Sequence, residues 1–180
     1  MKSIVLPMVA IALFLASCQK SSPPGTHYAH GFCLNDGCEC KEGYTGDQCS
    51  EMATPISVEL KAVEVLSIPE FHNGESWDAY EGYPDVACMI ANANQVIYEA
   101  EDVKTDIKEG GKVVFTDLSV QLVDVLATHK LRLLDIDVDQ KHDIIKYLYF
   151  TPFNKDKGFP ETIDIKEGEA EVRLHLKYHY

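Results

Sequence analysis

The sequence predicts an all-β protein, an antiparallel β-sandwich of about eight strands preceded by a small disulfide-rich module. Two patterns predict the sandwich: apolar and polar residues alternate in several segments after residue 54, and no segment keeps a long 3.6-residue period. Many short strands without intervening helices are typical of antiparallel sandwiches. The module is predicted by four cysteines between positions 33 and 49, because a segment this short cannot bury a core of its own.

Length and charge limit the range of functions. A chain of 180 residues suits one modest domain with appendages. The formal net charge of −13 argues against a nucleic-acid partner, because phosphate binding depends on clustered Lys and Arg. It also argues against docking on anionic lipid by charge alone.

The N-terminus has the features of an export signal. Lys2 precedes an apolar run over 4–16 that is too short to span a bilayer as a stable helix. The run ends in Leu-Ala-Ser-Cys, with the cysteine at position 18, and this resembles the lipobox of bacterial lipoproteins. The resemblance implies that 1–17 is removed and that Cys18 carries lipid, which would anchor the protein in the outer membrane or at the cell surface of a Gram-negative bacterium. The alternative is an ordinary signal peptide with an incidental cysteine.

Residues 18–29 are predicted to form a tether. Residues 19–27 contain almost nothing apolar and include the pair Pro23 and Pro24. Such a segment is expected to be semi-extended and disordered.

The cysteine spacing, Cys33-x4-Cys38-x-Cys40-x8-Cys49, predicts two disulfides in an exported chain. Spacing alone leaves three connectivities open. A zinc site is the competing interpretation, although Cys-x-Cys is an unusual pair for structural zinc.

The run over 40–49 resembles the C-terminal half of an EGF-like module, with Tyr44 and Gly46 between its last two cysteines. Only four of the usual six cysteines are present, so the module, placed at 30–50, would be a truncated one. The resemblance implies bonds between Cys33 and Cys38 and between Cys40 and Cys49.

The strands of the sandwich are predicted from alternation and turn residues. The expected segments are 56–66, 86–91 and 95–100 as a hairpin, 113–115, 118–125 as a strand or short helical turn, 130–134, 144–150 and 170–178. In the last segment Ala170, Val172, Leu174, Leu176 and Tyr178 share one face. Cys88 lies in an apolar run and is expected to be a buried free thiol.

An acidic turn between 130–134 and 144–150 is the first candidate site. Asp135 and Asp137 point to the same face of a strand, roughly 7 Å apart, and Asp143 can close the turn from the other side. Neighbouring carboxylates repel one another, and Ca²⁺ relieves this by taking about 6 to 8 oxygen ligands. The alternative is a solvated turn that is rich in Asp. An EF-hand does not fit, because its glycine and its closing glutamate would be Gln140 and Lys146.

A second loop, 75–86, carries Asp78 and Asp85 before another apolar strand. Two aspartates from one loop and three from another resemble the calcium-binding apex of a synaptotagmin-type C2 domain. The resemblance covers 54–180 and implies an eight-stranded sandwich. The residues that it implies as Ca²⁺ ligands are Asp78, Asp85, Asp135, Asp137 and Asp143, with Asp139 as a further candidate.

The sequence contains no nucleophile elbow, no HExxH and no glycine-rich phosphate loop, so we expect no enzymatic activity. The expected function is that of a lipid-anchored surface or envelope module that recognises anionic lipid, glycan or a protein ligand through Ca²⁺-bound loops. The side chains expected to contact the ligand are Trp77, Tyr80, Tyr83 and His142. The alternative is a structural or adhesion sandwich that does not depend on Ca²⁺.

Overall fold

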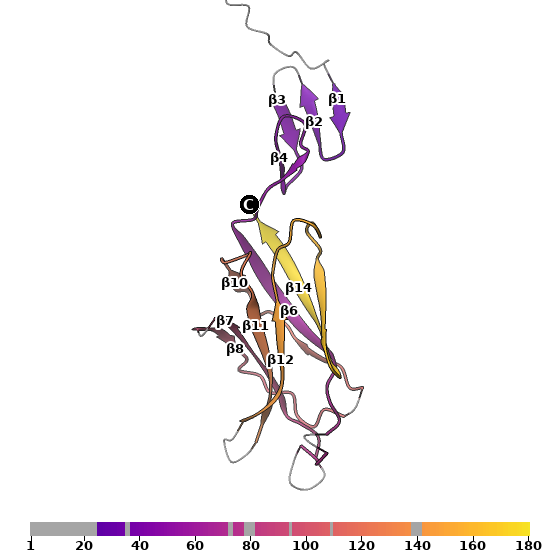
Figure 1. The fold of residues 1–180 in the computed structure, drawn as a ribbon, viewed down its shortest axis with the longest axis vertical. Helices are drawn as coiled ribbons and strands as arrows, with labels where there is room; N and C mark the ends of the chain where they lie inside the picture. Colours follow the sequence, from indigo (N-terminus) through magenta and orange to yellow (C-terminus); the bar gives the residue numbers. More distant parts are fainter. Residues whose placement is uncertain are drawn as a thin grey trace, which may run out of the picture.

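The computed structural model describes residues 25–34, 37–71, 74–77, 82–93, 95–108, 110–137 and 142–180. The regular elements in these ranges are all β-strands, arranged as a small N-terminal module on one end of a two-sheet sandwich (Figure 1). The predicted fold class, an all-β sandwich behind a disulfide-rich segment, is confirmed. No helix in the described part of the chain has the length and apolar character of a membrane span.

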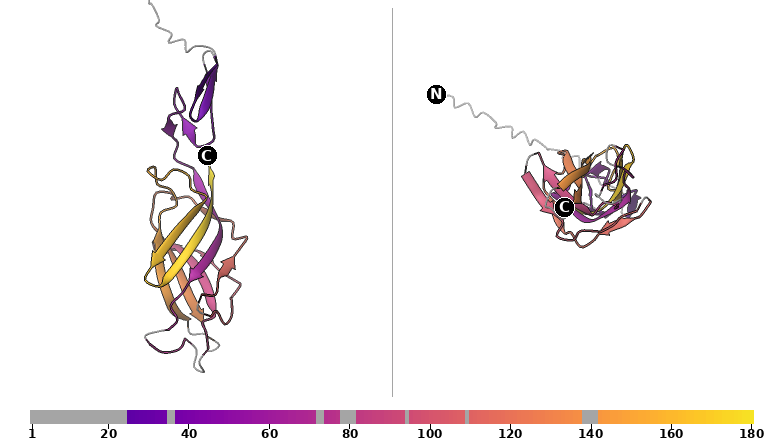
Figure 2. Two further views of the ribbon diagram at one scale, coloured as in Figure 1. Left: turned by 90° about the vertical axis from the view of Figure 1, so that its right-hand side faces the viewer. Right: turned by 90° about the horizontal axis from the view of Figure 1, so that it is seen from below.

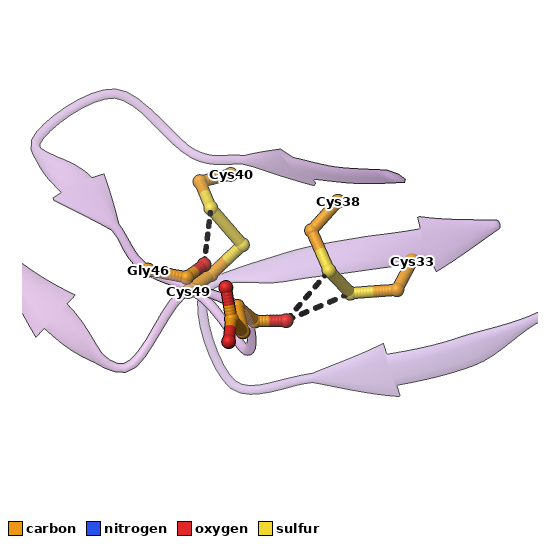
Figure 3. The surroundings of a disulfide bond; sticks show 6 residues. Cys33, Cys38, Cys40, Gly46 and Cys49 are labelled. Atoms are coloured by element: carbon orange, nitrogen blue, oxygen red, sulfur yellow. Dashed lines mark hydrogen bonds between the residues drawn. A yellow bond between two sulfur atoms is a disulfide. The ribbon is translucent and has the colours of Figure 1, made fainter. Parts of the chain in front are cut away.

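The module consists of two small sheets. One contains β1 (Thr26–Tyr28), β2 (Gly31–Leu34) and β3 (Gly37–Cys40), and the other pairs β4 (Tyr44–Thr45) with β5 (Glu51–Met52). Disulfides join Cys33 to Cys38 and Cys40 to Cys49, which confirms the predicted pairing (Figure 3). The predicted tether was too long at its C-terminal end, because β1 pairs with β2 from Thr26 onward.

The sandwich has nine strands within the ranges given above. One sheet has the order β10-β6-β14-β13, with β9 also paired to β6, and the other has the order β12-β11-β7-β8. Their bounds are β6 (Ser57–Ser67), β7 (Val86–Asn92), β8 (Gln95–Glu99), β9 (Val113–Phe115), β10 (Val120–Leu122), β11 (His129–Ile136), β12 (His142–Phe150), β13 (Thr162–Glu167) and β14 (Ala170–His179).

Strands β9 and β10 occupy one edge position together. β10 pairs with β6 at Val58 to Leu60, and β9 pairs with it further along, at Val63 to Val65. The edge is interrupted at 116–119, so each sheet has four strand positions. This agrees with the predicted eight-stranded sandwich.

Strand β6 departs from the predicted alternation. The sequence pattern places Val63 on the face opposite to Val58, yet both are fully buried. The register between β6 and β14 shifts between His175 and Leu176, where Ala62 and Leu60 are the respective partners. A β-bulge inserts one residue into a strand, so the buried face changes from even to odd positions at Lys61.

Strand β13 was not predicted. It forms a hairpin with β14 across Gly168, whose φ of 65° suits the turn. Ile163 and Ile165 are its only large apolar residues and are only partly buried against the core, so its hydrophobic pattern is weak. The segment 118–125, predicted as a strand or a short helical turn, contains the short strand β10.

The module packs on the end of the sandwich where the chain terminates (Figures 1 and 2). The Tyr44 and Phe159 rings meet edge to face at a centroid distance of 5.8 Å, and the His30 ring stacks on Tyr44 at a centroid distance of 3.7 Å. Gly43 has a φ of 86° and lies so close that an added Cβ would be 2.6 Å from Phe159 and 2.8 Å from the Tyr180 hydroxyl. These contacts fix the module along the long axis of the sandwich.

We predict that Gly43→Ala destabilises this junction. Alanine at positive φ costs roughly 1–2 kcal/mol, and the clash with Phe159 adds a further cost of about 1–3 kcal/mol. Gly74→Ala is the matched control, because its φ of 88° is similar but an added Cβ meets nothing within 4 Å. Urea denaturation should show a larger loss of unfolding free energy for Gly43→Ala. Equal losses would contradict the packing at the junction.

Candidate functional site

At the end of the sandwich far from the module, beside the β13–β14 turn, three chain connections bear the candidate aspartates, and we call these connections the loop end (Figure 1). They lead from β6 to β7, from β8 to β9 and from β11 to β12. The described residues of the loop end that bear on the site are 82–85, 102–108, 135–137 and 142–143.

Asp135 holds two of these connections together. Its side chain is fully buried, and Oδ1 accepts a hydrogen bond from the Asp85 N–H at 2.7 Å. The Asp85 carbonyl in turn accepts the Ile136 N–H at 2.9 Å. A buried carboxylate that receives a backbone N–H avoids part of its desolvation cost, so this contact ties the start of β7 to the end of β11.

Asp85 extends the connection to the third loop. Its carboxylate accepts the Asp106 N–H at 2.8 Å, and the Ile107 N–H donates to the Pro84 carbonyl at 3.1 Å. Val86 and Lys104 also form an isolated β-bridge. The loop between β8 and β9 therefore belongs to the site, which the sequence analysis did not predict.

A signal for this third loop is present in the sequence. Asp102 and Asp106 lie between two strands and precede Gly110, so this loop is acidic like the other two. Asp102 is ion-paired with Lys104, so part of the acidic charge of this loop is already balanced. The loop thus supplies Asp106 as a further acidic side chain.

Asp137 and Asp143 complete the acidic group. Asp143 is directly opposite Asp135 in the antiparallel ladder between β11 and β12, and directly opposite residues point to the same face. Asp137 follows Asp135 by two positions and is half-buried, whereas Asp143 is exposed. The structure therefore brings four of the five predicted ligands to one end of the sandwich. The fifth, Asp78, lies outside the described residues.

The donor set suits a hard cation, because carboxylate oxygens are the ligands that Ca²⁺ prefers. Among the described residues, however, no three His, Cys, Asp or Glu side chains are grouped closely enough to hold a metal ion. Asp139, like Asp78, is not among those residues. A calcium ion here would need one of these two, or a movement of Asp137 or Asp143, to complete its coordination.

The predicted ligand-contacting aromatics have different positions. Trp77 belongs to the core, at 8% exposure, and its Nε1 donates to the Pro69 carbonyl at 2.9 Å, so a role in ligand contact does not fit this position. Tyr83 is exposed, with Lys108 Nζ 5.8 Å from its ring centroid. His142 is exposed at the start of β12, and Tyr80 lies outside the described residues.

Of the remaining cysteines, Cys18 also lies outside the described residues. Cys88 is a buried free thiol, as predicted, and burial raises its pKa to about 12. A thiol with so high a pKa is protonated at neutral pH and is a poor nucleophile. Cys88 therefore acts as a core residue.

No protein-family profile matches the chain, and no curated protein matches its sequence. The chain is similar to several solved structures, some of which are C2 domains. The first C2 domain of plant Extended Synaptotagmin 1 has a TM-score of 0.44 at 12% identity, over 71% of this chain and 97% of that one.

Two further solved structures are similar. Human GIVD cytosolic phospholipase A2 has a TM-score of 0.46 at 12% identity, over 72% of this chain but only 18% of the enzyme. Calcium-bound Extended-Synaptotagmin 2, with its pair of C2 domains, has a TM-score of 0.38 at 16% identity, over 69% of this chain and 46% of that one. At these scores the likeness defines neither a family nor a function for the chain.

We predict that Asp135→Ala destabilises the protein more than Asp135→Asn. Alanine leaves the Asp85 N–H without its acceptor, which costs about 1–3 kcal/mol, whereas asparagine keeps an oxygen at the same place. Chemical denaturation measures both changes, with Asp137→Ala as a control on the less buried neighbour. Equal losses for the two Asp135 variants would contradict a structural role for this hydrogen bond.

Proposed function

We propose that the protein is a non-enzymatic binding module whose loop end binds Ca²⁺ and, through it, an anionic ligand. The observation that carries this proposal is that Asp85, just before β7, lies at the same end of the sandwich as Asp135 on β11 and Asp143 on β12. Asp137 and Asp106 add further negative charge beside them. A bound divalent cation would neutralise this group and offer open coordination positions to phosphate, sulfate or carboxylate groups.

The arrangement of the molecule supports a direction for this site. The loop end and the module lie at opposite ends of the long axis (Figure 2). We further propose that Cys18 carries lipid, as its lipobox-like context implies. A protein held at Cys18 would then direct Asp137 and Asp143 away from the anchoring membrane, toward a ligand on another surface or in solution.

A second candidate function also has a specific observation in its favour. The carboxylates of Asp85 and Asp135 already accept backbone N–H groups, so they organise the loops without an ion. A structural or adhesion sandwich would need no more than this. Ligand binding with Ca²⁺ and with chelator separates the two functions.

The calcium proposal predicts that Ca²⁺ raises the melting temperature of the chain. We expect a Kd of about 10⁻⁴ to 10⁻³ M, as in extracellular modules, and a stabilisation of about 2.7 kcal/mol at a hundredfold excess over Kd. Asp137→Asn with Asp143→Asn should abolish the shift, because the less buried pair then loses its charge while Asp135 keeps its structural hydrogen bond. Differential scanning fluorimetry in Ca²⁺, Mg²⁺ and chelator provides the measurement.

The control is Asp156→Asn with Glu161→Gln, which removes two exposed carboxylates from the opposite end of the sandwich. This pair should retain the shift. If about 5 mM Ca²⁺, a concentration above the expected range of Kd, does not raise the melting temperature of the wild-type protein, the calcium proposal is contradicted. Equal shifts with Mg²⁺ would indicate diffuse attraction of cations in place of a site.

The anchoring proposal predicts that Cys18→Ser gives an exported protein that is absent from the membrane fraction. The thiol is the attachment point for lipid, and each buried CH₂ contributes about 0.8 kcal/mol to membrane binding. Cell fractionation with detection of the processed N-terminus measures this. A variant that stays in the membrane pellet with unchanged processing would refute the lipobox assignment.

A further inference from the structure

The outer face of the β12-β11-β7-β8 sheet carries a compact group of cations and tyrosines. Tyr149 is the direct ladder partner of Lys130, and Tyr147 is the partner of Arg132. Directly opposite residues share a face of the sheet, and Tyr149 is 56% exposed, so this face meets solvent. We call these four residues the Lys/Tyr array.

The members of the array contact one another. Lys130 Nζ lies 5.3 Å from the ring centroid of Tyr147 and 5.8 Å from that of Tyr149. The Arg132 guanidinium lies 6.0 Å from the Tyr147 centroid. Cations within about 6 Å of aromatic ring centroids are attracted by the ring quadrupole, so these contacts favour the arrangement of the array.

Both cations lack an acidic partner among the described residues. The ion pairs found there involve other side chains, and Arg132 Nε is buried without a hydrogen-bond partner. Glu99 lies on the same row of the sheet, but two strands away, with Met89 between it and Arg132. The chain has a net charge of −13, so two neighbouring cations without an acidic partner form a local positive patch on a negatively charged protein.

The strand beside the array is apolar. Ala91, Met89 and Ala87 are the β7 partners of Lys130, Arg132 and Leu134, so they share the outer face. Strand β7 is therefore apolar on both faces, although only one of them faces the core between the sheets. Ala87 and Ala91 are nonetheless buried and Met89 is partly buried, so the exposed apolar surface at the array comes from the rings of Tyr147 and Tyr149.

The two tyrosines also line open cavities along the β12 edge. One, of about 510 Å³, is lined by Tyr147, Tyr149, Lys146 and Glu167 among others. The next, of about 360 Å³, shares Tyr149 and continues between β12 and β13, where Asn154 and Lys166 are among its lining residues. Together they make a long groove with aromatic rings and mixed polar groups.

We propose that this groove and the Lys/Tyr array bind an acidic polysaccharide independently of Ca²⁺. The apolar faces of sugar rings pack on Tyr147 and Tyr149, and the carboxylate or sulfate groups of the polymer pair with Lys130 and Arg132. Tyr147 and Tyr149 are two positions apart on one strand, about 7 Å, and so are the two cations. The tyrosines line the groove, and the two cations repeat with the same spacing on the neighbouring strand.

The acidic loop end does not prevent this binding. Lys130 precedes Asp135 by five residues on β11, a distance of about 17 Å along the strand. The Debye length at physiological ionic strength is about 8 Å. Repulsion from the loop end is thus largely screened at Lys130 and less so at Arg132, which lies three residues or about 10 Å from Asp135, whereas direct contacts with the cations are screened much less.

The experiment measures binding of oligogalacturonate to the full chain in EDTA, by calorimetry or an immobilised-glycan assay. Tyr147→Ala with Tyr149→Ala, and separately Lys130→Gln with Arg132→Gln, should each weaken binding at least tenfold. Lys61→Gln with Lys177→Gln, which removes the same charge from the other sheet, should leave it unchanged. Circular dichroism confirms that each variant is folded.

Three further probes decide the class of ligand. Neutral dextran, poly-L-glutamate and vesicles of phosphatidylglycerol with phosphatidylcholine should each bind at least tenfold more weakly. Equal binding of poly-L-glutamate would show an acidic-polypeptide surface, and binding of vesicles that the array variants abolish would show a membrane surface. Either outcome, or unchanged oligogalacturonate binding in both array variants, overturns the proposal.

The loop-end variant Asp137→Asn with Asp143→Asn should keep its affinity for oligogalacturonate in EDTA. This separates the array from the calcium proposal, because either can fail without the other. Loss of oligogalacturonate binding in this variant would place the glycan at the loop end and contradict a site on the sheet.

Discussion

The antiparallel pair β6 and β14 is the constraint on which the arrangement depends. β6 begins directly after the module, and β14 ends beside it, with the Ile56 N–H donating to the His179 carbonyl at 2.8 Å. β6 has 11 residues, about 36 Å of extended chain. The pair therefore spans the sandwich from the module to the loop end. Any site formed by the connection that follows β6 must lie at the far end from the module.

The same geometry separates the charges of the molecule. Acidic side chains gather where strands β7, β11 and β12 meet the loop end, and Asp135 serves there as a buried acceptor for a backbone N–H. Cations gather instead on the outer face of the same sheet, with Lys130 and Arg132 on β11 itself. One strand thus contributes to an acidic end and to a cationic face. An acidic chain can in this way present surfaces of opposite character to two ligands.

The sequence predicted most of the fold because alternation reports directly which face of a strand is buried. Strand β14 follows its pattern from Ala170 to Leu176. The prediction failed where the backbone departs from strict alternation between the two faces of a strand. The bulge near Lys61 moves Val63 to the buried face. At the site, the aspartates of β11 and β12 were predictable from their spacing. Asp106 was not, because its place depends on a hydrogen bond to Asp85 across 21 positions of the chain. Trp77 was misassigned, because an aromatic residue beside an acidic loop gives no sign of whether it packs inward.

The most direct test of the central claim is a Ca²⁺ titration of the isotopically labelled protein followed by amide NMR. The N–H groups of Asp85 and Asp106 donate to carboxylates of the loop end, so they report any change in the charge of those carboxylates. A calcium site predicts saturable shifts of these two amides, with amides near Phe159 and in the Lys/Tyr array unaffected. Small, unsaturable shifts spread over all acidic surfaces, or no shift at Asp85 and Asp106, would contradict it.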